Sequence, residues 1–202
     1  MVIGSTWLQK IAEKIGAAKE NIQPSSVDLS LGGEILELPS PIFSPDATRA
    51  RFHAGAYDRW RVPASRSKVY ESIPQEWKEF GVADKAYYYS IPDGEQFMFL
   101  PGMFYLASTK ERIRVPQDMR AFGSLKSTTA RLSINQLTAL YVDPGFEGTL
   151  VLELYALLPT LVRIGDPIIQ LEFAMVAGAS KYKGRYQGQD GIVLARRDDG
   201  HG

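Results

Sequence analysis

The sequence of 202 residues contains no cysteine. This absence excludes disulfide bonds, a thiol nucleophile, and zinc or iron–sulfur centres with cysteine ligands. Only two histidines occur, so a histidine-rich metal site is excluded, and a Ser-His-Asp triad would depend on His53, since His201 lies next to the C-terminal residue. The chain also lacks a run of about 18 apolar residues, as a membrane-spanning helix needs, and the apolar core of a signal peptide. We therefore expect a soluble, cytoplasmic protein in a reducing compartment.

An excess of charge of either sign is missing too, because 23 basic side chains balance 23 acidic ones. No global field then attracts nucleic acid or an anionic membrane, and we expect neither as a partner. Any site for a polyanion must be local. The length suits a single domain over residues 1–202, which buries enough surface to fold without disulfide or metal staples.

The first segment has the hydrophobic spacing of a helix. Leu8, Ile11, Ala12 and Ile15 follow the i, i+3, i+4, i+7 pattern. We predict a helix over 5–16, with Ser5 or Thr6 as its N-cap and Gly16 at its end.

After residue 20 the hydrophobic period changes to two. Val27, Leu29 and Leu31 alternate with polar residues and predict a strand, and Gly32-Gly33 predicts a turn before a second strand over 35–38. From residue 91 onward short strands alternate with turns, which are expected at Pro101-Gly102, Asp143-Pro144-Gly145 and Gly165-Asp166-Pro167. This spacing predicts an all-β barrel or sandwich.

Two segments differ from this pattern. Residues 39–90 are rich in proline, arginine and aromatic residues, and we expect an insertion-like region of loops and short strands with one short helix over 72–81. Residues 178–202 interleave glycines with Lys181, Lys183, Arg185 and two tyrosines. This composition suits a mobile lid that folds over a nucleotide, or alternatively a disordered basic tail.

Glu153 is the first candidate for chemistry. In TLVLELY the leucines 150, 152 and 154 point to one side of a strand, and Val151, Glu153 and Tyr155 point to the other. Apolar neighbours would partly desolvate the carboxylate and raise its pKa toward that of a useful base. The alternative is a solvent-facing glutamate on an exposed sheet face.

A second candidate is the run KSTTAR over 126–131, which places three hydroxyls between Lys126 and Arg131. Hydroxyls, backbone amides and cations at a turn suit phosphate oxygens. The alternative is a polar loop in which Ser127 or Thr128 caps a short helix. Asp143 and Asp28 are either functional carboxylates or ordinary turn and strand-end residues.

Taken together and in order, these segments resemble the dCTP deaminase family of the dUTPase-like superfamily. The resemblance rests on NIQPSSVDLSLGG (21–33), FMFLPGMFYLASTKERIRVP (97–116), KSTTARLSI (126–134), TALYVDPGFEGTLVLELYA (138–156), IGDPIIQLEF (164–173) and KYKGRYQGQ (181–189). It implies a mainly β fold, a distorted β-barrel or jelly-roll of the dUTPase-like type with a short N-terminal helix. It also implies a homotrimer with active sites between subunits.

The resemblance implies a catalytic group of Glu153, Ser127, Arg131 and Ala139. Glu153 is expected to take a proton from water and deliver it toward the cytosine ring and the leaving ammonia. Ser127 and the Ala139 carbonyl would hold that water, and Arg131 would orient Glu153 and contact the substrate. The implied nucleotide-binding residues are Lys126, Ser127, Thr128, Arg131, Asp143, Val151, Glu153, Tyr182, Arg185 and Gln189.

The expected reaction is hydrolysis of dCTP to dUTP and ammonia, feeding dUMP and dTTP synthesis. Magnesium is expected on the triphosphate and not in a protein cage. No zinc is expected, because this chain cannot build the H-x-E plus P-C-x-x-C arrangement of zinc-dependent base deaminases.

Several positions depart from the family pattern. Lys126 replaces the usual arginine and removes a bidentate phosphate contact, Thr128-Thr129 replace a Ser-Leu pair, and Tyr141 stands where a basic residue is common. Two other functions stay open, the first because Asp143 matches the dUTPase aspartate that activates water and the second because the phosphate-binding turn is substituted. One is a bifunctional enzyme that also converts dUTP to dUMP and pyrophosphate, and the other is a non-catalytic nucleotide-sensing regulator. Inhibition by dTTP is a further expectation from the resemblance.

Overall fold

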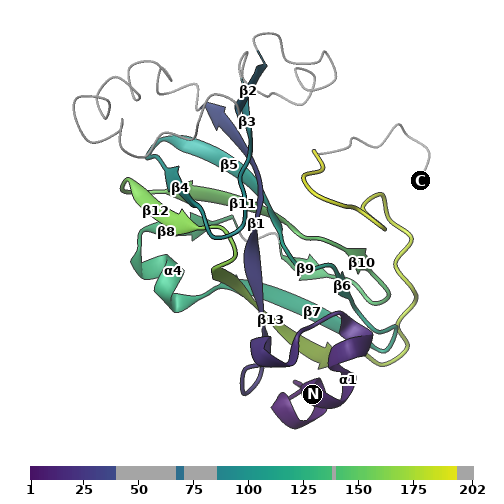
Figure 1. The fold of residues 1–202 in the computed structure, drawn as a ribbon. Coiled ribbons are helices and arrows are strands. Elements are labelled where there is room, and N and C mark those ends of the chain that lie inside the picture. The colour runs from purple at the N-terminus through teal and green to yellow at the C-terminus, as the bar shows by residue number, and fades with distance from the viewer. Residues whose placement is uncertain (40–66, 71–85, 138–139, 195–202) are drawn as a thin grey trace.

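The computed structural model describes residues 1–39, 67–70, 86–137 and 140–194 (Figure 1). In chain order the described elements are α1 (Ser5–Ile15), the 3-10 helix η1 (Lys19–Asn21), β1 (Val27–Pro39), β2 (Ser67–Tyr70), β3 (Ala86–Ser90), β4 (Gln96–Phe99), β5 (Met103–Thr109), β6 (Ile113–Arg114), β7 (Met119–Leu125), α4 (Ser127–Arg131), β8 (Ile134–Gln136), β9 (Tyr141–Val142), β10 (Glu147–Gly148), β11 (Val151–Ala156), β12 (Thr160–Arg163) and β13 (Pro167–Met175). Strands dominate, as the sequence predicts.

The described strands form one curled antiparallel sheet and two small ones. Seven strands of the large sheet follow the order β8-β11-β5-β1-β13-β7-β9, and β3 joins β1 and carries β2. The small sheets pair β10 with β6 and β12 with β4. The mainly β fold is thus confirmed. No described helix combines the length and the apolar character that crossing a membrane requires.

Helix α1 packs its apolar stripe against one end of the sheet. Leu8, Ala12 and Ile15 are buried, and Gly16 ends the helix in the left-handed conformation, at φ 74°. The predicted cap is wrong: the N-cap is Gly4, and no side chain caps the helix. The start of the helix is held in another way, because the Ser5 amide donates a hydrogen bond to the Pro24 carbonyl (2.8 Å).

The predicted turn at Gly32-Gly33 is also wrong, because β1 runs through both glycines. The first part of β1 pairs with β13, and the second part pairs with β5 and β3, with a register shift between Leu31 and Ile35. A Cβ at Gly33 would lie 2.2 Å from the Ile91 carbonyl oxygen. The glycines therefore permit a close backbone approach where one strand passes from one partner to another.

The strand that carries Glu153 lies inside the large sheet, between β5 and β8. Its burial alternates along the chain, and Leu152 and Leu154 are fully buried, as the sequence predicts. On the buried side an edge-to-face cluster of rings fills the core around Phe97, Phe99 and Tyr105, with centroids 4.8–5.8 Å apart. This packed core fixes which face of β11 is left for Glu153.

Other predicted elements have mixed outcomes. The turn at Pro101-Gly102 separates β4 from β5, and the turn at 165–167 separates β12 from β13, both as expected. The helix expected over 72–81 falls outside the described residues. Part of the segment predicted as insertion-like belongs to the main sheet, because β3 pairs with β1.

Candidate active site

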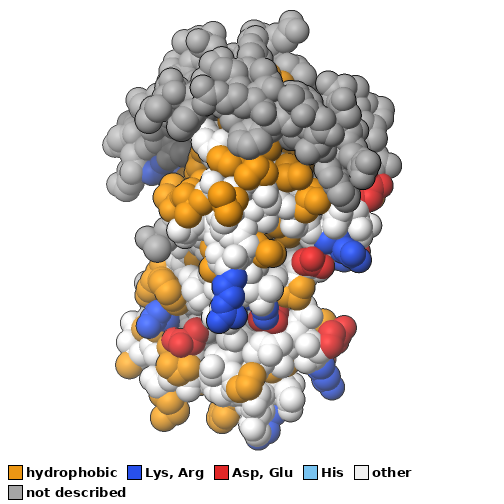
Figure 2. All heavy atoms as spheres, turned by 90° about the vertical axis from the view of Figure 1, so that its left-hand side faces the viewer, with side chains coloured by type: hydrophobic (Ala, Val, Ile, Leu, Met, Phe, Trp, Pro, Cys, Tyr) orange, Lys and Arg blue, Asp and Glu red, His pale blue; other side chains and the backbone are white. Residues whose placement is uncertain are grey.

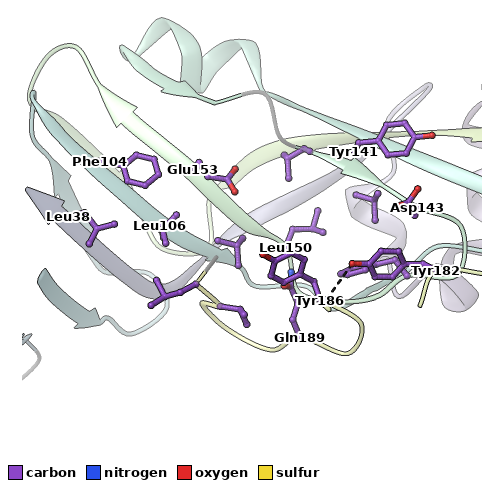
Figure 3. A pocket seen from close by; sticks show the side chains of 16 residues that line it. Leu38, Phe104, Leu106, Tyr141, Asp143, Leu150, Glu153, Tyr182, Tyr186 and Gln189 are labelled. Carbon is purple, nitrogen blue, oxygen red and sulfur yellow. Dashed lines mark hydrogen bonds between the residues drawn. The ribbon is translucent and has the colours of Figure 1, made fainter. Parts of the chain in front are cut away.

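A cavity of about 460 Å³ opens between β11, β5 and the C-terminal segment (Figure 3). That volume suits a small-molecule ligand. Its described lining consists of Leu38, Phe104, Leu106, Leu140, Tyr141, Val142, Asp143, Phe146, Leu150, Val151, Glu153, Tyr182, Tyr186, Gln189, Val193 and Leu194. Most of these lining residues are apolar, and Glu153 and Asp143 are the only two of them that carry a carboxylate.

Glu153 projects from β11 into this cavity (Figure 3). Glu153 lies directly opposite Leu106 in the ladder between β11 and β5. The two side chains therefore lie on the same face of the sheet. The Glu153 Oε2 atom is buried and has no hydrogen-bond partner among the described residues. Burial raises the pKa of Glu153 above its ordinary value of 4.5, and a hydrogen bond from its own backbone only partly opposes this. The prediction of a partly desolvated carboxylate is confirmed.

Asp143 approaches the cavity from the start of a tight turn. The Phe146 amide donates to the Asp143 carbonyl (3.2 Å), and Gly145 has φ 78°, the geometry that Pro followed by Gly favours. Phe146 is buried under the turn and also lines the cavity. The predicted turn therefore forms, and it places a carboxylate in the same cavity as Glu153 (Figure 3).

The C-terminal segment supplies one wall of the cavity. The Tyr182 amide donates to the Pro144 carbonyl (2.7 Å), and the Gly188 amide donates to the Glu147 carbonyl (2.8 Å), so the segment follows the edge of β10. Tyr182 and Tyr186 pack against the hydrophobic core. The described part of the tail is thus held against the domain over the cavity.

The cationic turn at α4 lies apart from the cavity lining. Ser127, Thr128 and Arg131 are exposed, and α4 forms as the short helix of the alternative interpretation. Its N-cap is Lys126 and no side chain caps it, so the capping by Ser127 or Thr128 that this alternative included is wrong. The Lys126 ammonium instead forms an ion pair with Asp28, whose carboxylate is almost completely buried.

The structure therefore divides the predicted site residues into two groups. The cavity brings together Asp143, Val151, Glu153, Tyr182 and Gln189. The described cavity lining does not include Lys126, Ser127, Thr128, Arg131 or Arg185. Ala139 lies outside the described residues, between Leu137, whose amide donates to the Glu153 carbonyl (3.0 Å), and Leu140 of the lining.

The sequence pattern did not reveal the apolar half of the cavity. Phe104 and Leu106 lie on β5, opposite Tyr155 and Glu153 of β11. Leu38 comes from β1 (Figure 3). Alternation along β5 was a usable signal, but it does not reveal which strand lies beside β11. Tyr186 carries a clearer signal, since it follows Tyr182 by four residues in the tail and also lines the cavity.

Comparisons with known proteins identify the family of this chain. A family model described as dCTP deaminase-like matches residues 4–176. A Sulfurihydrogenibium protein named "dCTP deaminase, dUMP-forming" is 34% identical over 179 residues, which cover 87% of this chain and 82% of the relative. A Halorubrum lacusprofundi protein named dCTP deaminase is 30% identical over 195 residues, with 92% and 82% coverage.

A solved structure shares the fold. The crystal structure of 2'-deoxycytidine 5'-triphosphate deaminase from Agrobacterium tumefaciens superposes with a TM-score of 0.54 at 19% identity and covers 87% of this chain. This chain spans 48% of the length of the Agrobacterium protein. Since the family model covers most of the sequence and two relatives reach 30% identity, the chain belongs to the dCTP deaminase-like family.

Proposed function

We propose that this protein hydrolyses dCTP to dUTP and ammonia and so feeds dUMP and dTTP synthesis in the cytoplasm. The observation that carries the proposal is the Glu153 carboxylate, which faces a ligand-sized cavity and whose Oε2 atom is buried without a hydrogen-bond partner among the described residues. A carboxylate with a raised pKa is suited to proton transfer near neutral pH. The relatives' names support the choice of dCTP as substrate.

In the proposed reaction Glu153 accepts a proton from water as the water oxygen bonds to C4 of the cytosine ring. The carboxyl group then delivers this proton to ring N3, accepts the proton of the new C4 hydroxyl group as the C4 carbonyl forms, and passes that second proton to the leaving amino group. The C4–N bond breaks, and ammonia leaves with the bonding electron pair. No zinc is used to activate the water in this proposal, because the glutamate and fixed hydrogen-bond partners do so.

The proposed site is completed by α4 of a neighbouring protomer in a homotrimer. Ser127 and Arg131 are exposed and do not belong to the described lining of the cavity in their own chain, which supports this arrangement. The side of the molecule that carries α4 and β8 also gathers hydrophobic side chains (Figure 2). The exposed leucines near these elements are Leu132, Leu137, Leu157 and Leu158.

The residues at the start of α4 fit triphosphate oxygens. Lys126 carries an ammonium group that pairs with Asp28 on a side chain that is 23% exposed, and Ser127 and Thr128 offer exposed hydroxyls. These residues would hold the phosphates, and the phosphates would hold magnesium. When bound, magnesium would neutralise part of the triphosphate charge.

A second activity, cleavage of dUTP to dUMP and pyrophosphate, has separate support. Relatives from Sulfurihydrogenibium and Persephonella marina are named "dCTP deaminase, dUMP-forming". Asp143 lines the same cavity as Glu153, so one pocket provides a carboxylate for each reaction. If Asp143 activates water for the second step, Asp143→Asn turns a dUMP-forming enzyme into one that releases dUTP.

The deciding experiment is product analysis by ion-pair chromatography after incubation with dCTP and magnesium. Release of dUTP and ammonia supports the deaminase, and release of dUMP with pyrophosphate supports the bifunctional enzyme. Unchanged dCTP, followed by unchanged dCMP and CTP, would overturn both and favour a nucleotide-sensing regulator. Addition of dTTP to an active sample tests the expected inhibition.

A further inference from the structure

The far end of the C-terminal segment is tied to β1 by one side chain. The backbone amide of Ile192 donates to Glu34 Oε2 (3.1 Å), and the Tyr88 hydroxyl donates to Glu34 Oε1 (2.9 Å). Glu34 is half-buried on the central strand, far along the sequence from the tail. Each carboxylate oxygen thus has a donor, and a charged acceptor strengthens both bonds.

Gly191 lies in close contact with the Glu34 carboxylate. Its φ is +64°, and a Cβ placed there would lie 2.1 Å from Glu34 Oε2. Only glycine therefore combines the left-handed backbone with this approach to the carboxylate. The tail sequence and the position of Glu34 are matched to each other at this point.

The tied point lies between two stretches that line the cavity. Gln189 precedes it, and Val193 and Leu194 follow it, and all three line the cavity that Glu153 faces. Gln189 is itself fixed to the neighbouring loop, because its Nε2 donates to the Thr149 carbonyl (2.7 Å) while the Thr149 amide donates to the Gln189 carbonyl (3.1 Å). Loss of the tie at 192 would release Val193 and Leu194 from the wall and would leave the preceding part of the tail held by its bonds to residues 144–149 alone.

We propose that Glu34 is a positioning residue that latches the C-terminal segment over the cavity and thereby retains the bound nucleotide. Glu34 is not among the described residues that line the cavity, so it acts through the tail. The role in nucleotide retention rests on the proposed deaminase function, whereas the latch itself does not. Opening of the latch widens the exit from the cavity without moving Glu153 on its strand.

The latch is tested first without nucleotide, by trypsin digestion of the full chain. Lys181, Lys183 and Arg185 are exposed in the held segment and provide cleavage sites. For Glu34→Ala we expect cleavage at these sites to accelerate about ten-fold, the effect of losing a hydrogen bond to a charged acceptor. Glu34→Gln keeps an acceptor oxygen and should restore most of the protection. Glu172→Ala, which removes an exposed carboxylate from β13, serves as the matched control and should digest like the wild type.

Gly191→Ala attacks the same contact from the tail side and keeps the test valid if Glu34→Ala fails to fold. It should accelerate tail cleavage as well, and the double variant should add little, because both changes break one contact. Wild-type rates of tail cleavage in Glu34→Ala and Gly191→Ala would overturn the latch. Acceleration at sites throughout the chain would also overturn it, since Glu34 would then support the whole fold.

The second readout is the steady-state kinetics of dCTP deamination. We expect KM for dCTP to rise about ten-fold in Glu34→Ala while kcat changes less than two-fold, with KM partly rescued by Glu34→Gln. Faster tail cleavage with an unchanged KM would overturn the role in retention. If the wild type deaminates no nucleotide, the proposed function fails, and the digestion still decides whether the latch exists.

Discussion

Glu153 and Leu106 face each other across the β5–β11 ladder, so a carboxylate is held against an apolar side chain at the floor of the cavity. The pairing explains why burial dominates the environment of Glu153 and raises its pKa. A sheet position fixes this relationship more rigidly than a loop would. The carboxylate is therefore held ready for proton transfer before any ligand binds.

Replacement of Glu153 by glutamine should abolish turnover and spare binding. The amide keeps the size of the side chain but cannot accept a proton, so we expect kcat for dCTP to fall by roughly 10²–10⁴-fold. Calorimetric titration should still detect dCTP binding. Full deamination by Glu153→Gln would contradict the assigned base, and Glu172→Gln on the exposed face of β13 is the control.

The raised pKa of Glu153 also predicts how stability depends on pH. Between the ordinary value of 4.5 and the higher folded pKa, the native state binds more protons than the unfolded state, so the free energy of unfolding falls as pH rises. Glu153→Gln removes this penalty. We expect the variant to melt at a higher temperature than the wild type at pH 7, with the difference shrinking at pH 4. A constant difference across this range would show that ionisation of Glu153 is not the cause.

The same pKa sets the acid limb of the activity profile. A general base must be ionised, so kcat/KM for dCTP should rise with pH through a value above 4.5. The measurement is kcat/KM against pH in buffers of constant ionic strength. An acid limb at or below the ordinary value of a glutamic acid would contradict a desolvated base.

Gly33→Ala should destabilise the fold. The added methyl group would lie 2.2 Å from the Ile91 carbonyl oxygen, and backbone cannot move away as a flexible side chain can. We expect the free energy of unfolding in urea to drop by about 1–3 kcal/mol. Gly4→Ala is the matched control, because its Cβ would meet only the Pro24 carbonyl oxygen at an ordinary 3.5 Å. Equal effects of the two substitutions would refute the close approach.

Removal of either member of the Asp28–Lys126 pair should have unequal effects. Asp28 is nearly fully buried, and its Oδ1 has no partner among the described residues, whereas the Lys126 side chain is 23% exposed. Lys126→Ala strands a buried charge and should lower the free energy of unfolding by about 3 kcal/mol. Asp28→Asn leaves a lysine that water can reach and should cost about 1 kcal/mol. Urea titration of both variants checks the order, and the reverse order would contradict it.

The spacing of apolar residues along the sequence was enough to predict which side of α1 and of β11 faces the core. The α1 stripe, the alternation around Glu153 and the turn after Asp143 all form as predicted. The turn predicted at Gly32-Gly33 is wrong because glycine is equally compatible with a turn and with a close approach between strands. The difference between them depends on Ile91, a residue far away in the sequence.

The sequence by itself determined the β-rich fold class, the exclusion of cysteine chemistry and the identity of Glu153 as the carboxylate between apolar neighbours. Only the tertiary structure decided which residues share a cavity. It brought Asp143 and Gln189 to Glu153, left Arg131 outside the described lining, and tied Ile192 to Glu34. The reason is physical: alternation fixes the face on which a side chain lies, whereas neighbours across strands follow from sheet order and register, which long-range packing selects.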